Sequence, residues 1–134
     1  MANRLFNQFA NTLESGVVKL FGTMTIGASG AITASSCKGF SVVKTAATTG
    51  RYTITLNDKY NSLKAIDIRS QGPADAALTS TSGIIASIRN VAVSSTIPIL
   101  QVQFSSNTNL ADADPTSGIV VYFEITLKNS SLTF

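Results

Sequence analysis

The chain has 134 residues, enough for one domain with a substantial core, and only 13% of them are charged. Disorder goes with high charge and low hydrophobicity, so a chain with 44% hydrophobic residues is not expected to be disordered. The net charge is +3, but the basic residues are scattered and form no run, which argues against a nucleic-acid partner. A surface so poor in charge is typical of proteins that pack against others.

Residues 1–16 differ from the rest of the chain and are predicted to form a short amphipathic helix or docking arm. A helix of this length is marginal by itself, so its apolar side must pack on something. Two alternatives stay open, the chain's own β domain and a partner. Four apolar residues at helical spacing, the N-terminal stripe, are the candidate contact residues of this segment: Leu5, Phe6, Phe9 and Leu13. No continuous apolar run resembles a signal peptide or approaches the roughly 20 residues that span a bilayer, so no membrane partner is expected.

Residues 17–134 are predicted to form a single β domain, because apolar and polar side chains alternate between turn residues. The alternation over 18–26 returns over 31–35 as a hairpin, after a tight turn at 27–30. Residues 57–63 are predicted to be a one-turn helix or a compact connection. The other predicted strands cover residues 40–44, 51–56, 64–70, 83–93, 99–104 and 119–128.

Seven or eight short strands at this spacing predict an all-β fold, an antiparallel β-sandwich or barrel of jelly-roll-like character. The side chains of one parity in each strand should form its core. The predicted core contains Leu20, Met24, Ile26, Tyr52, Ile54, Leu100, Val102, Phe104, Phe123 and Ile125.

The strand predicted over 119–128 has the clearest pattern of the chain. Its odd positions, from Ile119 to Leu127, are all apolar and should be buried. The opposite face carries Val120 and Tyr122, which is more apolar than contact with solvent requires. We therefore predict that these two residues lie at a contact with another subunit or a partner.

The loop predicted over 105–117 contains an oxygen-rich set of side chains: Asn107, Asn109, Asp112 and Asp114. Such a loop could bind Ca²⁺, but the spacing lacks the EF-hand pattern and its terminal Glu. Asn and Asp are also the usual turn residues, because their side chains accept hydrogen bonds from neighbouring backbone N–H groups. The turn role is favoured, and no metal or other cofactor is predicted.

Reactive side chains are few, because the chain has no histidine and a single cysteine, Cys37. A nucleophilic Cys37 would need an Asp, Glu or Lys as its base, and a small half-buried packing residue is the favoured interpretation. The seven acidic residues are dispersed, so the paired carboxylates of a glycosidase cannot be assembled. We therefore expect that the chain is not an enzyme.

Three stretches, in this order, resemble one family: Leu20–Ile32, Gly50–Leu63 and Asp114–Ser131. Together they resemble the small virion proteins of tailed bacteriophages that decorate or cement the capsid, including head-fibre-like proteins. The resemblance covers most of residues 17–131, and residues 64–113 contribute little to it.

The resemblance implies a β-sandwich or barrel that forms a homo-oligomer, often a trimer, and binds the outer face of a shell built from the major capsid protein. Such a protein is assembled in the host cytoplasm and is located on the capsid surface of the virion. The alternative function is a host-recognition, receptor-binding module of a head fibre or tail, which would use the loops at 71–82 and 105–117. Neither function involves nucleic acid or a membrane.

Overall fold

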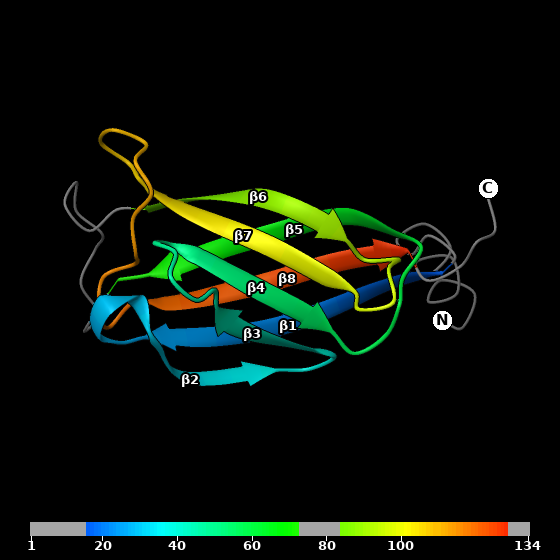
Figure 1. The fold of residues 1–134 in the computed structure, drawn as a ribbon. Coiled ribbons are helices and arrows are strands. Elements are labelled where there is room, and N and C mark those ends of the chain that lie inside the picture. Colours follow the sequence, from blue (N-terminus) through cyan, green and yellow to red (C-terminus); the bar gives the residue numbers. More distant parts are fainter. Residues whose placement is uncertain (1–15, 73–83, 129–134) are drawn as a thin grey trace, which may run out of the picture.

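Two four-stranded antiparallel sheets face each other in the computed structural model, which describes residues 16–72 and 84–128 (Figure 1). The strands are β1 (Val17–Ile26), β2 (Ile32–Cys37), β3 (Phe40–Lys44), β4 (Arg51–Leu56), β5 (Ser62–Gln71), β6 (Ile84–Ala92), β7 (Ile99–Ser106) and β8 (Val120–Lys128). The first sheet has the order β2-β1-β8-β5, and the second has the order β3-β4-β7-β6. The all-β prediction is confirmed, and of the two architectures that the sequence left open, the fold is the sandwich.

The strand boundaries agree with the sequence pattern to within a few residues. The hairpin return, predicted over 31–35, runs over Ile32–Cys37, because its pairing with β1 continues to Cys37 opposite Gly22. Between them, η1 (Ala28–Gly30) is a 3-10 turn, and it is the only helical element within residues 16–72 and 84–128. The predicted N-terminal helix or arm, with its four-residue stripe, lies outside the described residues.

Residues 57–63 form no helix, so of the two predicted forms only the compact connection is right. The backbone N–H of Tyr60 donates to the carbonyl of Val93 at 3.0 Å, and that of Asn61 donates to Lys128 at 2.7 Å. These partners belong to distant parts of the chain, and they take the donors that a helical turn would otherwise use. The segment therefore joins the two sheets, and β5 begins at Ser62 instead of the predicted residue 64.

The core lies between the inner faces of the two sheets, and it contains the predicted residues with one exception. Leu20 points inward but is only half-buried. It lies beside Gly39, which has no side chain that could cover the Leu20 methyl groups. On the last strand the alternation is confirmed, because the residues of odd parity are all buried: Ile119, Val121, Phe123, Ile125 and Leu127.

Gly22 interrupts the inner face of β1 and makes room for an aromatic pair. A Cβ atom at this position would lie 2.5 Å from Cζ of Phe40 and 2.7 Å from Sγ of Cys37. Because glycine has no Cβ, the Phe40 ring reaches under β1 and packs edge-to-face on Phe123, with ring centroids 6.3 Å apart. Cys37 is half-buried there, and burial raises the pKa of its thiol, in keeping with a packing residue.

The first and last residues of the described strands lie at the same end of the sandwich. Val17, the first residue of β1, pairs with Lys128, the last residue of β8. At the opposite end, β1 leads into the η1 turn, and the backbone N–H of Ile26 donates to Ile119 just before β8. In Figure 1 the η1 turn and the start of β1 accordingly lie at opposite ends of the sandwich.

Candidate functional site

The outer face of the first sheet carries the two most exposed aromatic rings among the described residues. Phe21 on β1 is 58% exposed and Tyr122 on β8 is 44% exposed. The strand register places Tyr122 between Thr23 of β1 and Arg69 of β5, in the middle of the face. Exposed aromatic rings on neighbouring strands are a common mark of an interaction surface.

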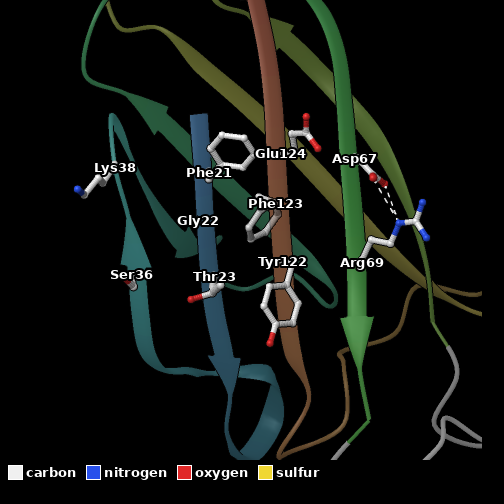
Figure 2. A pocket seen from close by; sticks show the side chains of 10 residues that line it. All are labelled: Phe21, Gly22, Thr23, Ser36, Lys38, Asp67, Arg69, Tyr122, Phe123 and Glu124. Atoms are coloured by element: carbon white, nitrogen blue, oxygen red, sulfur yellow. Dashed lines mark hydrogen bonds and ion pairs between the residues drawn. The ribbon is translucent and has the colours of Figure 1, made fainter. Parts of the chain in front are cut away.

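The two rings lie at a shallow depression of about 450 Å³ in this face, shown in Figure 2. All four strands of the first sheet contribute to it, and Lys38, in the connection between β2 and β3, is its one lining residue outside the strands. The residues around it are Phe21, Gly22, Thr23, Ser36, Lys38, Asp67, Arg69, Tyr122, Phe123 and Glu124.

Charged side chains on the face pair with one another around the rings. Lys19 Nζ lies 2.9 Å from a carboxylate oxygen of Glu124. Arg69 Nε lies 3.3 Å from both carboxylate oxygens of Asp67, on the β5 side of Tyr122 (Figure 2). These exposed pairs contribute little stability. They nevertheless neutralise the charges beside the aromatic residues within the chain itself, before any partner protein binds.

The Tyr122 side chain is also oriented by a hydrogen bond. Its hydroxyl donates to Oε1 of Gln71 at 2.7 Å, across to the end of β5. The bond holds the ring along the face and leaves much of it exposed. A rigid, partly exposed ring loses little conformational entropy when a partner covers it.

The structure places Val120 and Tyr122 on the outer face of β8, the side that the alternation predicted. Val120 is half-buried between Thr25 of β1 and Gln71 of β5, and Tyr122 is exposed. Sequence reasoning did not single out Phe21. Its odd position in the alternation of residues 18–26 was a sufficient signal, because it shares that parity with Lys19 and the threonines of β1.

The loop between β7 and β8 uses its polar residues within the molecule. The Asp114 carboxylate accepts a hydrogen bond from the backbone N–H of Gly50 at 2.6 Å and lies 3.0 Å from Lys44 Nζ. Oδ1 of Asn109 accepts from the backbone N–H of Ala111 at 3.1 Å. These are turn and anchoring roles. Within residues 16–72 and 84–128 no three Cys, Asp or Glu side chains are grouped where a metal ion could be shared.

Asp114 belongs to a set of contacts that fastens the η1 turn to the second sheet. Lys44 Nζ donates to the carbonyl of Ser29, and the Tyr52 hydroxyl donates to the carbonyl of Gly30, each at 2.5 Å. Burial is the main cause that raises the pKa of the Tyr52 phenol above its ordinary value, and the Asp114 carboxylate adds to it. We call this set, Lys44, Gly50, Tyr52 and Asp114 with the η1 carbonyls, the end clamp.

Replacing Tyr52 with phenylalanine should make the chain less sensitive to alkali. The folded state keeps the phenol neutral, whereas in the unfolded chain it ionises near its ordinary pKa of 10.0. The raised pKa therefore makes its full contribution to the free energy of unfolding below pH 10. That contribution is lost as pH rises further, by up to about 1.4 kcal/mol per pH unit. Urea unfolding at about pH 9 and pH 11 should show a larger loss for the parent than for Tyr52→Phe.

Near neutral pH the same variant should lose about 1–3 kcal/mol, because the buried Gly30 carbonyl loses its donor. Tyr60, whose pKa burial also raises, is present in both chains and serves as an internal control. Equal losses of stability for both chains between the two pH values would contradict the role given to Tyr52.

Comparison of the chain with family models, curated proteins and solved structures gave no match. Among the residues that the structure describes, no helix is long and apolar enough to cross a bilayer. The interpretation of the outer face therefore depends on its own geometry and on the resemblance carried by the three sequence stretches.

Proposed function

We propose that the chain is a structural virion protein of a tailed bacteriophage, and that it decorates or cements the outer surface of the capsid as a homo-oligomer. The observation that carries the proposal is the exposed pair Phe21 and Tyr122 on the rigid outer face of the first sheet. In this proposal the face binds the major capsid protein.

The residues that carry the resemblance support the choice of this face. The stretch Leu20–Ile32 contains most of β1, and Asp114–Ser131 contains all of β8. These two strands are neighbours at the centre of the first sheet, and each contributes one of the exposed rings. The family-like stretches thus build the surface to which we assign shell binding.

The chemistry of the face suits a stable protein contact. Interface centres are enriched in aromatic residues and depleted of charge, and the rim around them is polar. Here the register places Phe21 opposite Glu124 and Tyr122 opposite Arg69, so each ring lies beside one of the ion pairs Lys19–Glu124 and Arg69–Asp67. A shell subunit could cover the rings without breaking either ion pair.

A homotrimer is the proposed oligomer, by the resemblance, with Val120 and Tyr122 at a subunit or shell contact. Val120 lies beside Gln71 on the same outer face, so one continuous surface could serve both contacts. Light scattering of the purified chain should then give three times its mass of 14.0 kDa. A monomer at high concentration would contradict a trimer formed before attachment.

Shell binding should weaken when either ring is removed. We expect Phe21→Ala and Tyr122→Ala each to weaken binding by roughly 2 kcal/mol, about 30-fold, if the rings are at the centre of the contact. The measurement is co-sedimentation of the purified chain with shells that lack it, from the phage that encodes it.

Val43→Ala is the matched control, because Val43 is 56% exposed but lies on the second sheet. It should bind shells like the parent, and parental binding by both ring variants would contradict the assignment of the face.

Quantitative mass spectrometry of purified particles tests whether the chain decorates the capsid or recognises the host. A copy number close to that of the major capsid protein fits decoration, whereas a few copies per particle would favour the host-recognition module.

A further inference from the structure

Strand β2 is an edge of the first sheet, and on one side it has no partner strand among the described residues (Figure 1). On its other side β2 pairs with β1, and just after β2 the backbone N–H of Lys38 donates to the carbonyl of Phe21, the residue opposite it. In an antiparallel pair, residues that bond to the partner alternate with residues whose N–H and C=O groups point away from it. Since Lys38 bonds to β1, Ser36 does so as well, and the backbone groups of Ser35 and Cys37 point to the open side.

These backbone groups are available for a further strand. Within residues 16–72 and 84–128, the backbone N–H and C=O groups of Ser35 and Cys37 have no partner beyond β1. Ser35 is exposed, and so are Ala34 and Ser36 on either side of it. Both ends of β2 continue into described residues, the η1 turn before it and β3 after it. An exposed strand with free donors and acceptors along one side is a template for another strand.

The sequence of β2 lacks the features that protect two of the other edges. In β5 and β6 the pairing shifts at a basic residue, Lys64 and Arg89 respectively. Bulges and charged residues on edge strands are the usual devices that prevent strand addition. The pairing of β2 shifts at Thr33, near its start, and its residues, Ile32–Cys37, include no charged residue and no proline. The remainder of this strand is therefore regular and open to addition.

The open edge is continuous with the depression that holds Phe21 and Tyr122. Ser36 of β2 and Lys38 just after it both line the depression. The Lys38 side chain points away from both rings (Figure 2), and it makes no ion pair with a described residue. A strand added beside β2 would place one of its side chains next to Ser36 on the outer face, and an acidic side chain near its end would meet Lys38.

We propose that an extended segment of the major capsid protein adds to the first sheet beside β2, as a fifth strand, and that it carries an acidic side chain that pairs with Lys38. This inference rests on the proposed function, because it specifies how the capsid protein meets the outer face. Backbone hydrogen bonds to Ser35 and Cys37 provide affinity, and side chains beside Ser36 and Lys38 provide specificity. A second copy of β2 suits the edge less well, since pairing of two identical strands about a two-fold axis closes a dimer and not the proposed trimer.

Ser35→Pro tests the added strand, with Ser35→Ala as its matched control. The Ser35 N–H is not used by β1, so proline removes a donor that the fold does not need, and edge strands accept proline at such positions. In co-sedimentation with shells that lack the chain, the proline variant should bind roughly tenfold more weakly or worse. The alanine variant keeps the N–H and should bind like the parent. Parental binding by both variants would overturn the proposal.

Hydrogen exchange of the parent chain supplies a measurement that needs no substitution. On shells, the amides of Ser35 and Cys37 should exchange more slowly by roughly tenfold or more, because the added strand accepts their hydrogen bonds. The amide of Ser36, which already donates to β1, should change little, and so should the amides of β6. Fragmentation mass spectrometry resolves the single amides. Unchanged exchange at Ser35 and Cys37 in the bound chain would overturn the proposal whether or not the proline variant folds.

Lys38→Glu tests the acidic side chain of the partner. The substitution should weaken shell binding by about fivefold, because an attraction between opposite charges becomes a repulsion. Arg89→Glu is the control, since it changes the net charge equally but lies on β6, an edge of the second sheet. It should bind like the parent. Equal effects of the two substitutions, or none from Lys38→Glu, would contradict an acidic partner at this position.

The outcomes separate this inference from the proposed function. If the parent chain does not bind shells, both are wrong. If Phe21→Ala weakens binding and Ser35→Pro does not, the outer face keeps its role and the added strand is wrong. A dimer of the parent chain that forms without shells and is dissociated by Ser35→Pro would assign β2 to a second copy, which would overturn the inference as well.

Discussion

Phe123→Ala is expected to lower the free energy of unfolding by about 3–5 kcal/mol. The side chain is only 3% exposed, and its ring packs edge-to-face on Phe40. Truncation removes the burial of the ring and leaves a cavity that the β-sandwich can close only in part. A loss of this size is a large fraction of the total stability of a small domain, which is about 5–15 kcal/mol. Urea unfolding followed by circular dichroism measures it.

Phe21→Ala is the matched control, since it removes the same side chain from the outer face of the adjacent strand. Phe21 is 58% exposed, and its truncation should change stability by less than about 1 kcal/mol. Equal losses for the two variants would contradict the assignment of inner and outer faces. The comparison also shows whether the Phe21 variant is well folded before it is used in shell-binding experiments.

Gly50→Ala should destabilise the chain by roughly 3 kcal/mol or more. Gly50 has a φ of +69°, a conformation that costs a residue with a side chain about 1–2 kcal/mol. A Cβ atom there would also overlap the carbonyl oxygens of Ala113 and Phe104, which are backbone atoms and cannot rotate away. The substitution would disturb the hydrogen bonds from Gly50 to Asp114 and from Phe104 to Gly50. Thermal unfolding of the purified variant is the measurement.

Gly39→Ala separates the two causes of that loss. Gly39 also has a positive φ, +84°, but its Cβ would meet a methyl group of Leu20, at 2.8 Å. A leucine methyl group can move aside, so the expected loss is about 1–2 kcal/mol, from the backbone conformation. If Gly50→Ala and Gly39→Ala were equally stable, the end clamp would not depend on the close approach at Gly50.

The strands could be predicted because their signal is local. The period of two in β8 was sufficient to assign its buried face, from Ile119 to Leu127, without knowledge of any partner strand. The same parity rule would have placed Phe21 outside. Gly22 follows it at an inner position and has no side chain to mark the alternation, so the pattern of β1 was less distinct.

The end clamp could not be predicted, because it joins residues that are far apart in the chain. Asp114 and Gly50 are 64 positions apart, and the sequence around Asp114 indicates only a turn. The connection at 57–63 has the same explanation, since Tyr60 and Asn61 donate to carbonyls of distant segments. The sequence likewise could not decide between sandwich and barrel. A barrel closes only if its edge strands pair with each other, and such pairing between distant strands leaves no local signal in the sequence.

The pairing of Val17 with Lys128 means that the order of strands along the chain is only one way to build this sandwich. Their Cα atoms are about 5 Å apart, so a short linker could join the two ends of the described fold. New termini could then be opened at the exposed tip of the β7–β8 loop, near Asn107 and Leu110, at the end of the molecule that holds the η1 turn. A protein fused there would project from the end of the sandwich opposite to the pair Val17–Lys128. The same sandwich could thus carry a fused protein in either of two directions.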